Sequence, residues 1–238
     1  MRQKPFFWLI GLLVLALAVG CGGDDNGTNG NGDDEPEDLT IQQISVPQGL
    51  TEAATEEPMA AMAVGYVTLA NSIAGYGSFF ETPAASSSQT SGDTLTVTWS
   101  NGSLTVIMKY WETTTTDNWK IMLNGTDGST VYVNWTFMEA EQNKSGTGGS
   151  LVIYDENTTT VILSWVWTID TSDNITVVFT NYEDDERIEI VGNANGTGSV
   201  EYYENNVLLY EIEWYADGSG AWWNYSVTPN TNGTWSIT

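Results

Sequence analysis

The sequence contains no histidine, one cysteine, and only six lysine and arginine residues among its 238 positions. The absence of histidine excludes Ser-His-Asp and Cys-His catalysis, histidine-containing zinc sites and the commonest general base. The single cysteine, Cys21, excludes a disulfide within the chain, so the fold depends on its core alone. These absences favour a protein that is not an enzyme, with no metal ion or other cofactor.

Basic residues are scarce, whereas acidic ones are not: 31 Asp and Glu residues set a net charge of −25. Beyond the first 20 residues the basic residues are Lys109, Lys120, Lys144 and Arg187. Nucleic acids and anionic membrane surfaces repel a chain of this charge, so no nucleic-acid partner is expected. The acidity has two explanations that stay open: a high-salt habitat, where ions screen the repulsion, or an ordinary surface protein rich in Thr and Asn.

Residues 1–20 are expected to form a secretory signal peptide that ends just before Cys21. The basic residues Arg2 and Lys4 precede an apolar run, residues 6–19, which ends in Leu17-Ala18-Val19-Gly20-Cys21. The run is shorter than the ~20 residues that a membrane-spanning helix needs. The ending resembles the lipobox of bacterial lipoproteins. The resemblance implies cleavage after residue 20, acylation of Cys21 with fatty acids such as palmitate, and attachment to a membrane through that lipid.

Residues 21–44 are expected to comprise the lipidated cysteine and a flexible acidic linker. Residues 22–40 contain one apolar side chain, Leu39, and so bury too little surface to offset the entropy of ordering. A flexible stretch of this length reaches ~25 Å on average. Asp24 and Asp25 resemble the surface-export signals of Bacteroidota lipoproteins. The expected location is therefore the cell envelope, on the outer membrane, with periplasmic and surface-exposed placements both open.

Residues 45–238 are expected to form one domain, which starts with a helical region over residues 45–80. Apolar residues recur there at spacings of three and four. Thr55 is the expected cap, and Pro58 is tolerated in a first turn. We expect the apolar stripe to pack against the rest of the domain. Its members are Met59, Met62, Tyr66, Leu69, Ile73 and Tyr76.

From Leu95 onward the chain reads as short strands separated by tight turns. Dipeptides such as Asn101-Gly102, Asn124-Gly125 and Asn232-Gly233 accept the backbone of tight hairpins, so consecutive strands are antiparallel neighbours. The predicted strands are 95–99, 104–112, 119–123, 130–138, 150–154, 161–169, 175–181, 187–191, 199–203, 207–215, 220–227 and 234–237. About twelve twisted strands rarely stay flat. The predicted fold is mainly β: an antiparallel meander forming a barrel or half-barrel, with one N-terminal helix on its apolar face.

Alternation along the strands indicates one buried and one wet face. Leu208, Tyr210, Ile212 and Trp214 share one side of their strand, with Glu211 and Glu213 on the other. An apolar or lipid-like ligand held between helix and sheet is the first functional hypothesis. The residues expected to line its cavity are Met59, Met62, Tyr66, Trp165, Trp167 and Trp214.

Two hypotheses of other classes stay open. A glycan-binding module would use outward-facing aromatic side chains, for which we select Trp111, Trp222 and Tyr215. A structural or adhesive surface protein would need no small ligand. The same aromatics also serve as cross-strand packing in a wide sheet.

Acidic residues suggest two weaker hypotheses. Acidic turns, such as the one containing Asp170, Asp173 and Asn174, supply oxygen atoms of the kind that Ca²⁺ prefers, but turns select Asp and Asn for local backbone bonding as well. The adjacent predicted strands also carry glutamates that could pair for glycoside hydrolysis, which needs two facing carboxylates. These are Glu201, Glu204, Glu211 and Glu213. They fit better as solvated positions, so the prediction remains a membrane-anchored, non-enzymatic envelope lipoprotein.

Overall fold

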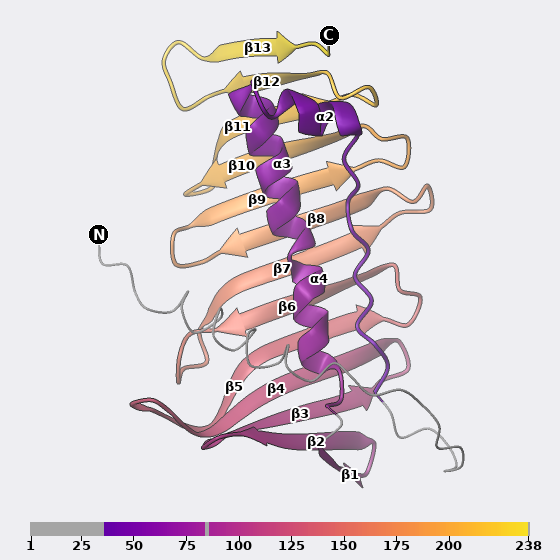
Figure 1. The fold of residues 1–238 in the computed structure, drawn as a ribbon, viewed down its shortest axis with the longest axis vertical. Coiled ribbons are helices and arrows are strands. Elements are labelled where there is room, and N and C mark those ends of the chain that lie inside the picture. The colour runs from indigo at the N-terminus through magenta and orange to yellow at the C-terminus, as the bar shows by residue number, and fades with distance from the viewer. Residues whose placement is uncertain (1–35, 84–85, 238) are drawn as a thin grey trace.

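The computed structural model describes residues 36–83 and 86–237. The signal, Cys21 and the first part of the predicted linker lie outside these residues. The described chain forms one thirteen-stranded sheet in which every strand pairs with the next along the sequence, antiparallel in each case (Figure 1). The predicted fold class, a mainly β antiparallel meander with helical cover, is confirmed.

The strands are short near both edges of the sheet and longest at β4 and β5. Their bounds are β1 Ser87–Ser91, β2 Thr94–Asn101, β3 Leu104–Glu112, β4 Thr116–Asp127, β5 Thr130–Asn143, β6 Gly148–Tyr154, β7 Val161–Ile169, β8 Ile175–Asn181, β9 Glu186–Gly192, β10 Gly198–Glu204, β11 Val207–Trp214, β12 Gly220–Asn224 and β13 Thr231–Trp235. Strands β1 and β13 are the two edges, so the sheet is open, as in the half-barrel alternative. Strand β1 was not predicted, because Ser87–Ser91 contains no apolar residue.

The helical region is divided into α2 (Gln48–Ala53), α3 (Pro58–Asn71), α4 (Ile73–Tyr76) and a 3₁₀ turn, η2 (Gly77–Phe80). Helices α3 and α4 run across the strands as a column on one face of the sheet, here called the helix face (Figure 1). Pro58 starts α3, as expected. Thr55 does not cap it, because its hydroxyl donates to the carbonyl of Glu52 at 2.8 Å, at the end of α2.

The side of α3 that contacts the sheet is one position away from the predicted stripe. Its buried residues are Ala60, Ala63, Val67 and Ala70. Small side chains at the line of contact let the helix axis approach the sheet closely. The predicted stripe residues Met59, Met62, Tyr66 and Leu69 flank this line and are only partly buried. Ile73 in α4 is buried as predicted.

A second column covers the helix face beside the helices. Residues 36–47, called the strap below, run extended along the sheet from β4 to α2 (Figure 1). Two of its own side chains, Leu39 and Ile44, are buried. This corrects the predicted linker boundary at residue 44, since apolar side chains at its C-terminal end pack into the core.

Two side-chain amides hold the strap in place of a neighbouring strand. Gln142 of β5 donates to the carbonyl of Thr40 at 2.6 Å and accepts from its N–H at 3.1 Å. Asn71 of α3 makes the same two bonds to Ile44, at 2.8 and 2.9 Å. Each amide reproduces the donor and acceptor of a peptide group, which satisfies backbone groups that would otherwise be unpaired.

Tryptophan side chains on the helix face lie over glycines of the neighbouring strand. Trp167 of β7 faces Gly149 of β6, and Trp214 of β11 faces Gly198 of β10. A methyl group added at either glycine would overlap the indole ring. These glycines are therefore the spaces in which large rings lie flat against the sheet, which explains how a single-layer sheet accommodates so many tryptophans.

Candidate functional site

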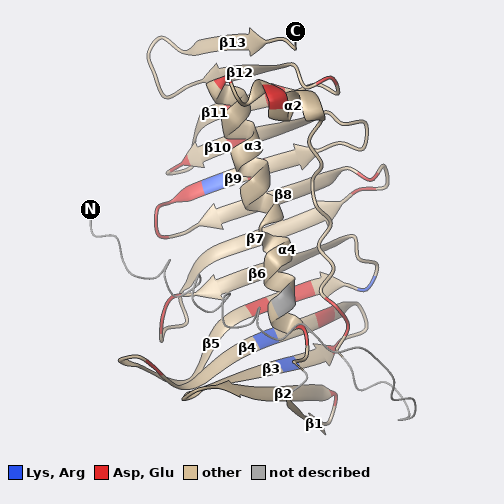
Figure 2. Ribbon diagram, viewed as in Figure 1, with Lys and Arg blue, Asp and Glu red and all other residues tan. Residues whose placement is uncertain are grey.

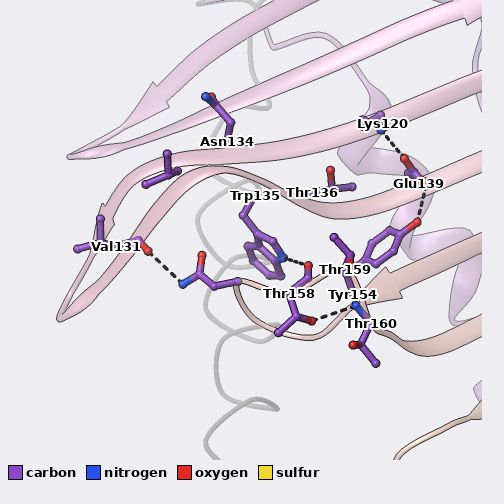
Figure 3. A pocket seen from close by; sticks show the side chains of 12 residues that line it. Lys120, Val131, Asn134, Trp135, Thr136, Glu139, Tyr154, Thr158, Thr159 and Thr160 are labelled. Atoms are coloured by element: carbon purple, nitrogen blue, oxygen red, sulfur yellow. Dashed lines mark hydrogen bonds and ion pairs between the residues drawn. The ribbon is translucent and has the colours of Figure 1, made fainter.

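The sheet forks between β5 and β6, and a groove fills the opening. Strand β5 pairs with β6 only over Met138–Gln142, whereas its pairing with β4 continues back to Thr130. Residues 130–137 therefore have a strand partner on one side alone. The groove there, called the fork groove below, has a volume of about 950 Å³ (Figure 3). Its lining residues are Lys120, Val131, Val133, Asn134, Trp135, Thr136, Glu139, Tyr154 and residues 157–160.

The outer wall of the groove belongs to a projecting hairpin, the β4–β5 arm (residues 124–134). The predicted turn Asn124-Gly125 is instead a bulge inside β4, where the pairing shifts between Leu123 and Gly125. Gly125 has φ +112° and leaves no room for a side chain beside the carbonyl of Ser103. A bulge adds twist and bends the strand pair, so the arm departs from the line of the sheet.

The opposite wall is the loop between β6 and β7, and three hydrogen bonds fix it to β5. Asn157 donates through Nδ2 to the carbonyl of Val131 at 3.0 Å. The indole of Trp135 donates to the carbonyl of Thr158 at 3.1 Å. The hydroxyl of Tyr132 donates to Glu156 at 2.9 Å. These bonds tie the loop to β5 across the fork and so fix the position of one wall relative to the other; Figure 3 draws the bonds to Val131 and from Trp135.

One end of the groove contains a charged group that is neutralised internally. Lys120 pairs with Glu139 at 2.6 Å, and the Tyr154 hydroxyl donates to the same carboxylate. Burial alone would raise the pKa of Glu139, but the hydrogen bonds from Lys120 and Tyr154 and the lysine charge outweigh it and lower the pKa. Burial and the bond to Glu139 raise the pKa of Tyr154 to about 12. At neutral pH the three groups together carry no net charge.

The rest of the lining is neutral and polar above an aromatic floor. Thr136, Thr159 and Thr160 have hydroxyls for which the described residues offer no hydrogen-bond partner, and the same holds for the amide of Asn134. Trp135 is buried beneath them and stacks on Tyr132, with ring centroids 5.2 Å apart. Hydroxyls and an amide both donate and accept, so the groove suits a neutral ligand rich in hydroxyl groups.

The six residues predicted to line an apolar cavity do not form one site. Trp165 and Trp167 lie on β7 and Trp214 lies on β11, all three fully buried. The ring of Trp165 packs against those of Tyr76 in α4 and Phe179 in β8, with ring centroids 5.6 and 4.9 Å away. Four strand spacings of ~4.8 Å separate β7 from β11. The tryptophans therefore pack in different parts of the core, and none lines the groove.

The three predicted helix residues lie partly exposed beside the same core. Met59, Met62 and Tyr66 lie along α3. Tyr66 stacks on Tyr202 of β10, with ring centroids 5.7 Å apart and planes within 11° of parallel. Their role as ligand contacts stays a prediction, and their observed contacts are packing contacts.

The aromatics selected for glycan binding are scattered. Trp111 lies on β3 and Tyr215 follows β11, near opposite ends of the sheet. Trp222 was predicted to point outward, but it faces Ile212 across the ladder and packs on the helix face. Its neighbour Trp223, which faces Glu211, lies instead on the side of the sheet opposite the helices, called the open face below. The alternation of β12 was therefore read out of phase by one residue.

None of the four glutamates considered for hydrolysis lines the groove: Glu201, Glu211 and Glu213 lie on the side of the sheet opposite the helices, whereas Glu204 shares the side of β10 that carries Val200 and Tyr202. Glu201 faces Glu211 across β10 and β11. Tyr203 donates to Glu201, and Tyr225 donates to Glu211 at 2.9 Å. Asp170 accepts from the N–H groups of Ser172 and Asn174, as expected for a turn residue. Among the described residues, no group of three or more acidic or cysteine side chains is arranged to hold a metal ion.

Sequence reasoning missed the groove as a site. The run Asn157-Thr158-Thr159-Thr160 looked like an ordinary polar turn, and Asn124-Gly125 looked like a hairpin turn. The one available signal was length, because two turn dipeptides, Asn124-Gly125 and Asp127-Gly128, occur within five residues. Only one of them can be the turn, so the other indicates a bulge.

The comparisons with known proteins leave the chain without an assigned family. No protein-family model matches it, and a search of curated proteins finds no significant match. Over residues 36–83 and 86–237, none of the helices has both the length and the apolar character required to cross a membrane.

Proposed function

We propose that this protein is a lipid-anchored, non-enzymatic envelope protein that binds a neutral glycan in the fork groove. The observation that carries the proposal is the groove lining: unpartnered threonine hydroxyls and an asparagine amide above a buried tryptophan, next to a charge pair that cancels itself. Sugars present hydroxyls that both donate and accept, together with apolar ring faces, and this lining complements both features.

Charge favours neutral over acidic sugars. Lys120 is already paired with Glu139, and Asp155 and Glu156 flank the loop wall. The whole chain carries a net charge of −25, which repels anionic ligands at long range. An apolar ligand is less well supported, because the three tryptophans expected to line its site are buried in the core and spread from β7 to β11. The three expected helix residues lie partly exposed on α3.

The anchoring part of the proposal rests on the lipobox-like residues that end in Cys21. Cys21→Ser is expected to move the full chain, expressed in its own host, from the outer-membrane fraction into the soluble fraction, because the acyl chains provide most of the membrane affinity. Immunoblots of fractionated cells measure this, with Ser45→Ala as a matched control that leaves the protein in the membrane. Unchanged fractionation of Cys21→Ser would rule out lipid anchoring.

Glycan binding is tested with the full chain and neutral glycans prepared from the envelope of its own host. Thr159→Val and Thr160→Val each remove one groove hydroxyl at almost constant volume. Each is expected to weaken binding about 3- to 10-fold, the loss of one hydrogen bond in a partly dry site. Isothermal titration measures the dissociation constants.

Thr171→Val is the matched control for this experiment, because Thr171 is an exposed loop residue at the opposite end of β7. It should bind like the unmodified chain. If no envelope glycan binds, or if the groove variants bind as tightly as the control, the glycan proposal fails and a structural or adhesive role without a small ligand is favoured.

A further inference from the structure

The β4–β5 arm exposes apolar side chains beside the groove. Val131 and Val133 are 59% and 76% exposed, and both line the groove. Val133 is the most exposed large hydrophobic residue of the described chain. The arm projects beyond the ends of the neighbouring strands (Figure 1). Apolar side chains concentrated on a projecting tip indicate contact with another apolar surface.

The arm also lacks the charge that characterises the rest of the protein. Within residues 124–134, Asp127 is the one charged residue. Most of the arm is accordingly drawn tan in Figure 2, in contrast to acidic connections such as residues 182–185 between β8 and β9. A tip with this composition avoids the repulsion that the remainder of the chain would meet at a lipid surface.

The arm is formed by β4 and β5, the same two strands that hold the start of the described chain at their opposite ends. The indole of Trp119 on β4 donates to the carbonyl of Glu37 at 3.1 Å, and Gln142 on β5 holds Thr40. Fourteen residues lie between Cys21 and Pro36. The described chain therefore joins the sheet at β4 and β5, nine strand spacings or ~43 Å from the far edge at β13.

We infer that the glycan bound in the fork groove is the headgroup of a neutral glycolipid in the membrane that holds Cys21, with Val131 and Val133 inserted beside it at the lipid surface. This inference rests on the proposed function, because it names the source of the same ligand. The groove supplies polar contacts to the sugar, and its outer wall supplies the apolar contacts that a free oligosaccharide would not use.

The test uses the mature full chain with Cys21→Ser, so that the anchor itself does not hold the protein on vesicles. The probes are vesicles made from the total envelope lipids of the host, the same vesicles after periodate oxidation of the sugars, and the water-soluble oligosaccharides released from those lipids. Co-sedimentation measures vesicle binding, and isothermal titration measures binding of the free oligosaccharides.

Binding to untreated vesicles is expected, with loss of at least tenfold after oxidation. The double variant Val131→Ser/Val133→Ser should lose vesicle binding at least tenfold but keep binding to the released oligosaccharides. The matched control is Val207→Ser/Val227→Ser, because those valines are 58% and 41% exposed near the far edge of the sheet. It should behave like the parent chain.

The outcomes separate the two proposals. Oligosaccharide binding without a preference for vesicles, or an arm variant that binds vesicles like its control, overturns the glycolipid inference and leaves the glycan proposal standing. Vesicle binding that survives oxidation shows a plain lipid contact and also overturns the inference. Failure of both vesicles and oligosaccharides to bind overturns both proposals.

Discussion

Replacing Trp214 by alanine is expected to lower the free energy of unfolding by about 3–5 kcal/mol. Trp214 is 1% exposed, and its ring lies over Gly198, which has no side chain to fill the space that the substitution would leave. The neighbouring main chain is held by the ladders to β10 and β12, so the cavity cannot close by collapse. Urea unfolding followed by tryptophan fluorescence and far-UV circular dichroism measures the change.

Two further variants sharpen this experiment. Trp111 is half-buried and lies on the open face, so water already contacts part of its ring. Trp111→Ala should therefore lower the free energy of unfolding by less than half as much as Trp214→Ala. Trp214→Phe should also cost less than half, because the buried indole N–H of Trp214 has no hydrogen-bond partner among the described residues and its removal relieves a desolvation cost. Equal losses for Phe and Ala would show that the indole N–H contributes a bond.

Raising the pH from 10 to 12 is expected to destabilise the protein steeply. Burial raises the pKa of Tyr66 from 10.0 to about 12, together with electrostatic repulsion from Glu186 and Tyr210. The pKa of Tyr154 is also raised to about 12. Burial, hydrogen bonds to carboxylates or both raise the pKa of six further tyrosines. These are Tyr76, Tyr110, Tyr132, Tyr202, Tyr203 and Tyr225.

The sign follows from which state holds more protons. Below pH 10 both states keep these tyrosines protonated, so the raised pKa values do not make stability depend on pH. Between pH 10 and 12 the unfolded chain loses protons that the folded chain retains, so the free energy of unfolding falls as pH rises. The slope is at most about 1.4 kcal/mol per pH unit for each tyrosine, and smaller for rings that solvent reaches.

Urea midpoints at a series of pH values, with tyrosinate absorbance recorded in parallel, measure this slope. Phenylalanine has no proton to lose. Tyr66→Phe should therefore reduce the slope by the contribution of at most one proton, about 1.4 kcal/mol per pH unit, and Tyr66→Phe/Tyr154→Phe by that of at most two. A slope that stays the same in both variants would contradict the assignment of the alkaline transition to Tyr66 and Tyr154, which are both partly buried.

Local pattern was sufficient to predict much of the sheet. The bounds of β3, β7 and β8 agree with the predicted strands 104–112, 161–169 and 175–181, because alternating apolar residues are bounded there by clear turn residues. The side-chain directions in β11 were also predicted: Ile212 and Trp214 are buried, and Glu211 and Glu213 lie on the other face. Strand pairing follows too, since turns this short permit only antiparallel neighbours.

The errors occurred where local residues are compatible with two structures. Asn124-Gly125 suits a turn and a bulge equally, and the choice of the bulge depends on Ser103 in the turn before β3, whose carbonyl approaches Gly125 closely. Residues 36–44 resemble a solvated linker, yet Gln142 and Asn71 bind their backbone from 102 and 27 positions away. Helix α3 rotates toward its alanines because the sheet requires a close approach, and a period of 3.6 alone does not reveal which edge of an apolar stripe is nearest.

The sequence by itself determined the class of the protein: a histidine-free, disulfide-free chain with a lipobox-like start and a meander of antiparallel strands, because composition and short-range periodicity act over a few residues. Only the tertiary structure decided where a site could form. The groove exists because β5 extends beyond its pairing with β6 and the loop between β6 and β7 forms hydrogen bonds with the unpaired part. Residues from β4, β5 and β6 therefore line one groove together with residues 157–160. Such a meeting depends on strand lengths and long-range contacts, which no local pattern records.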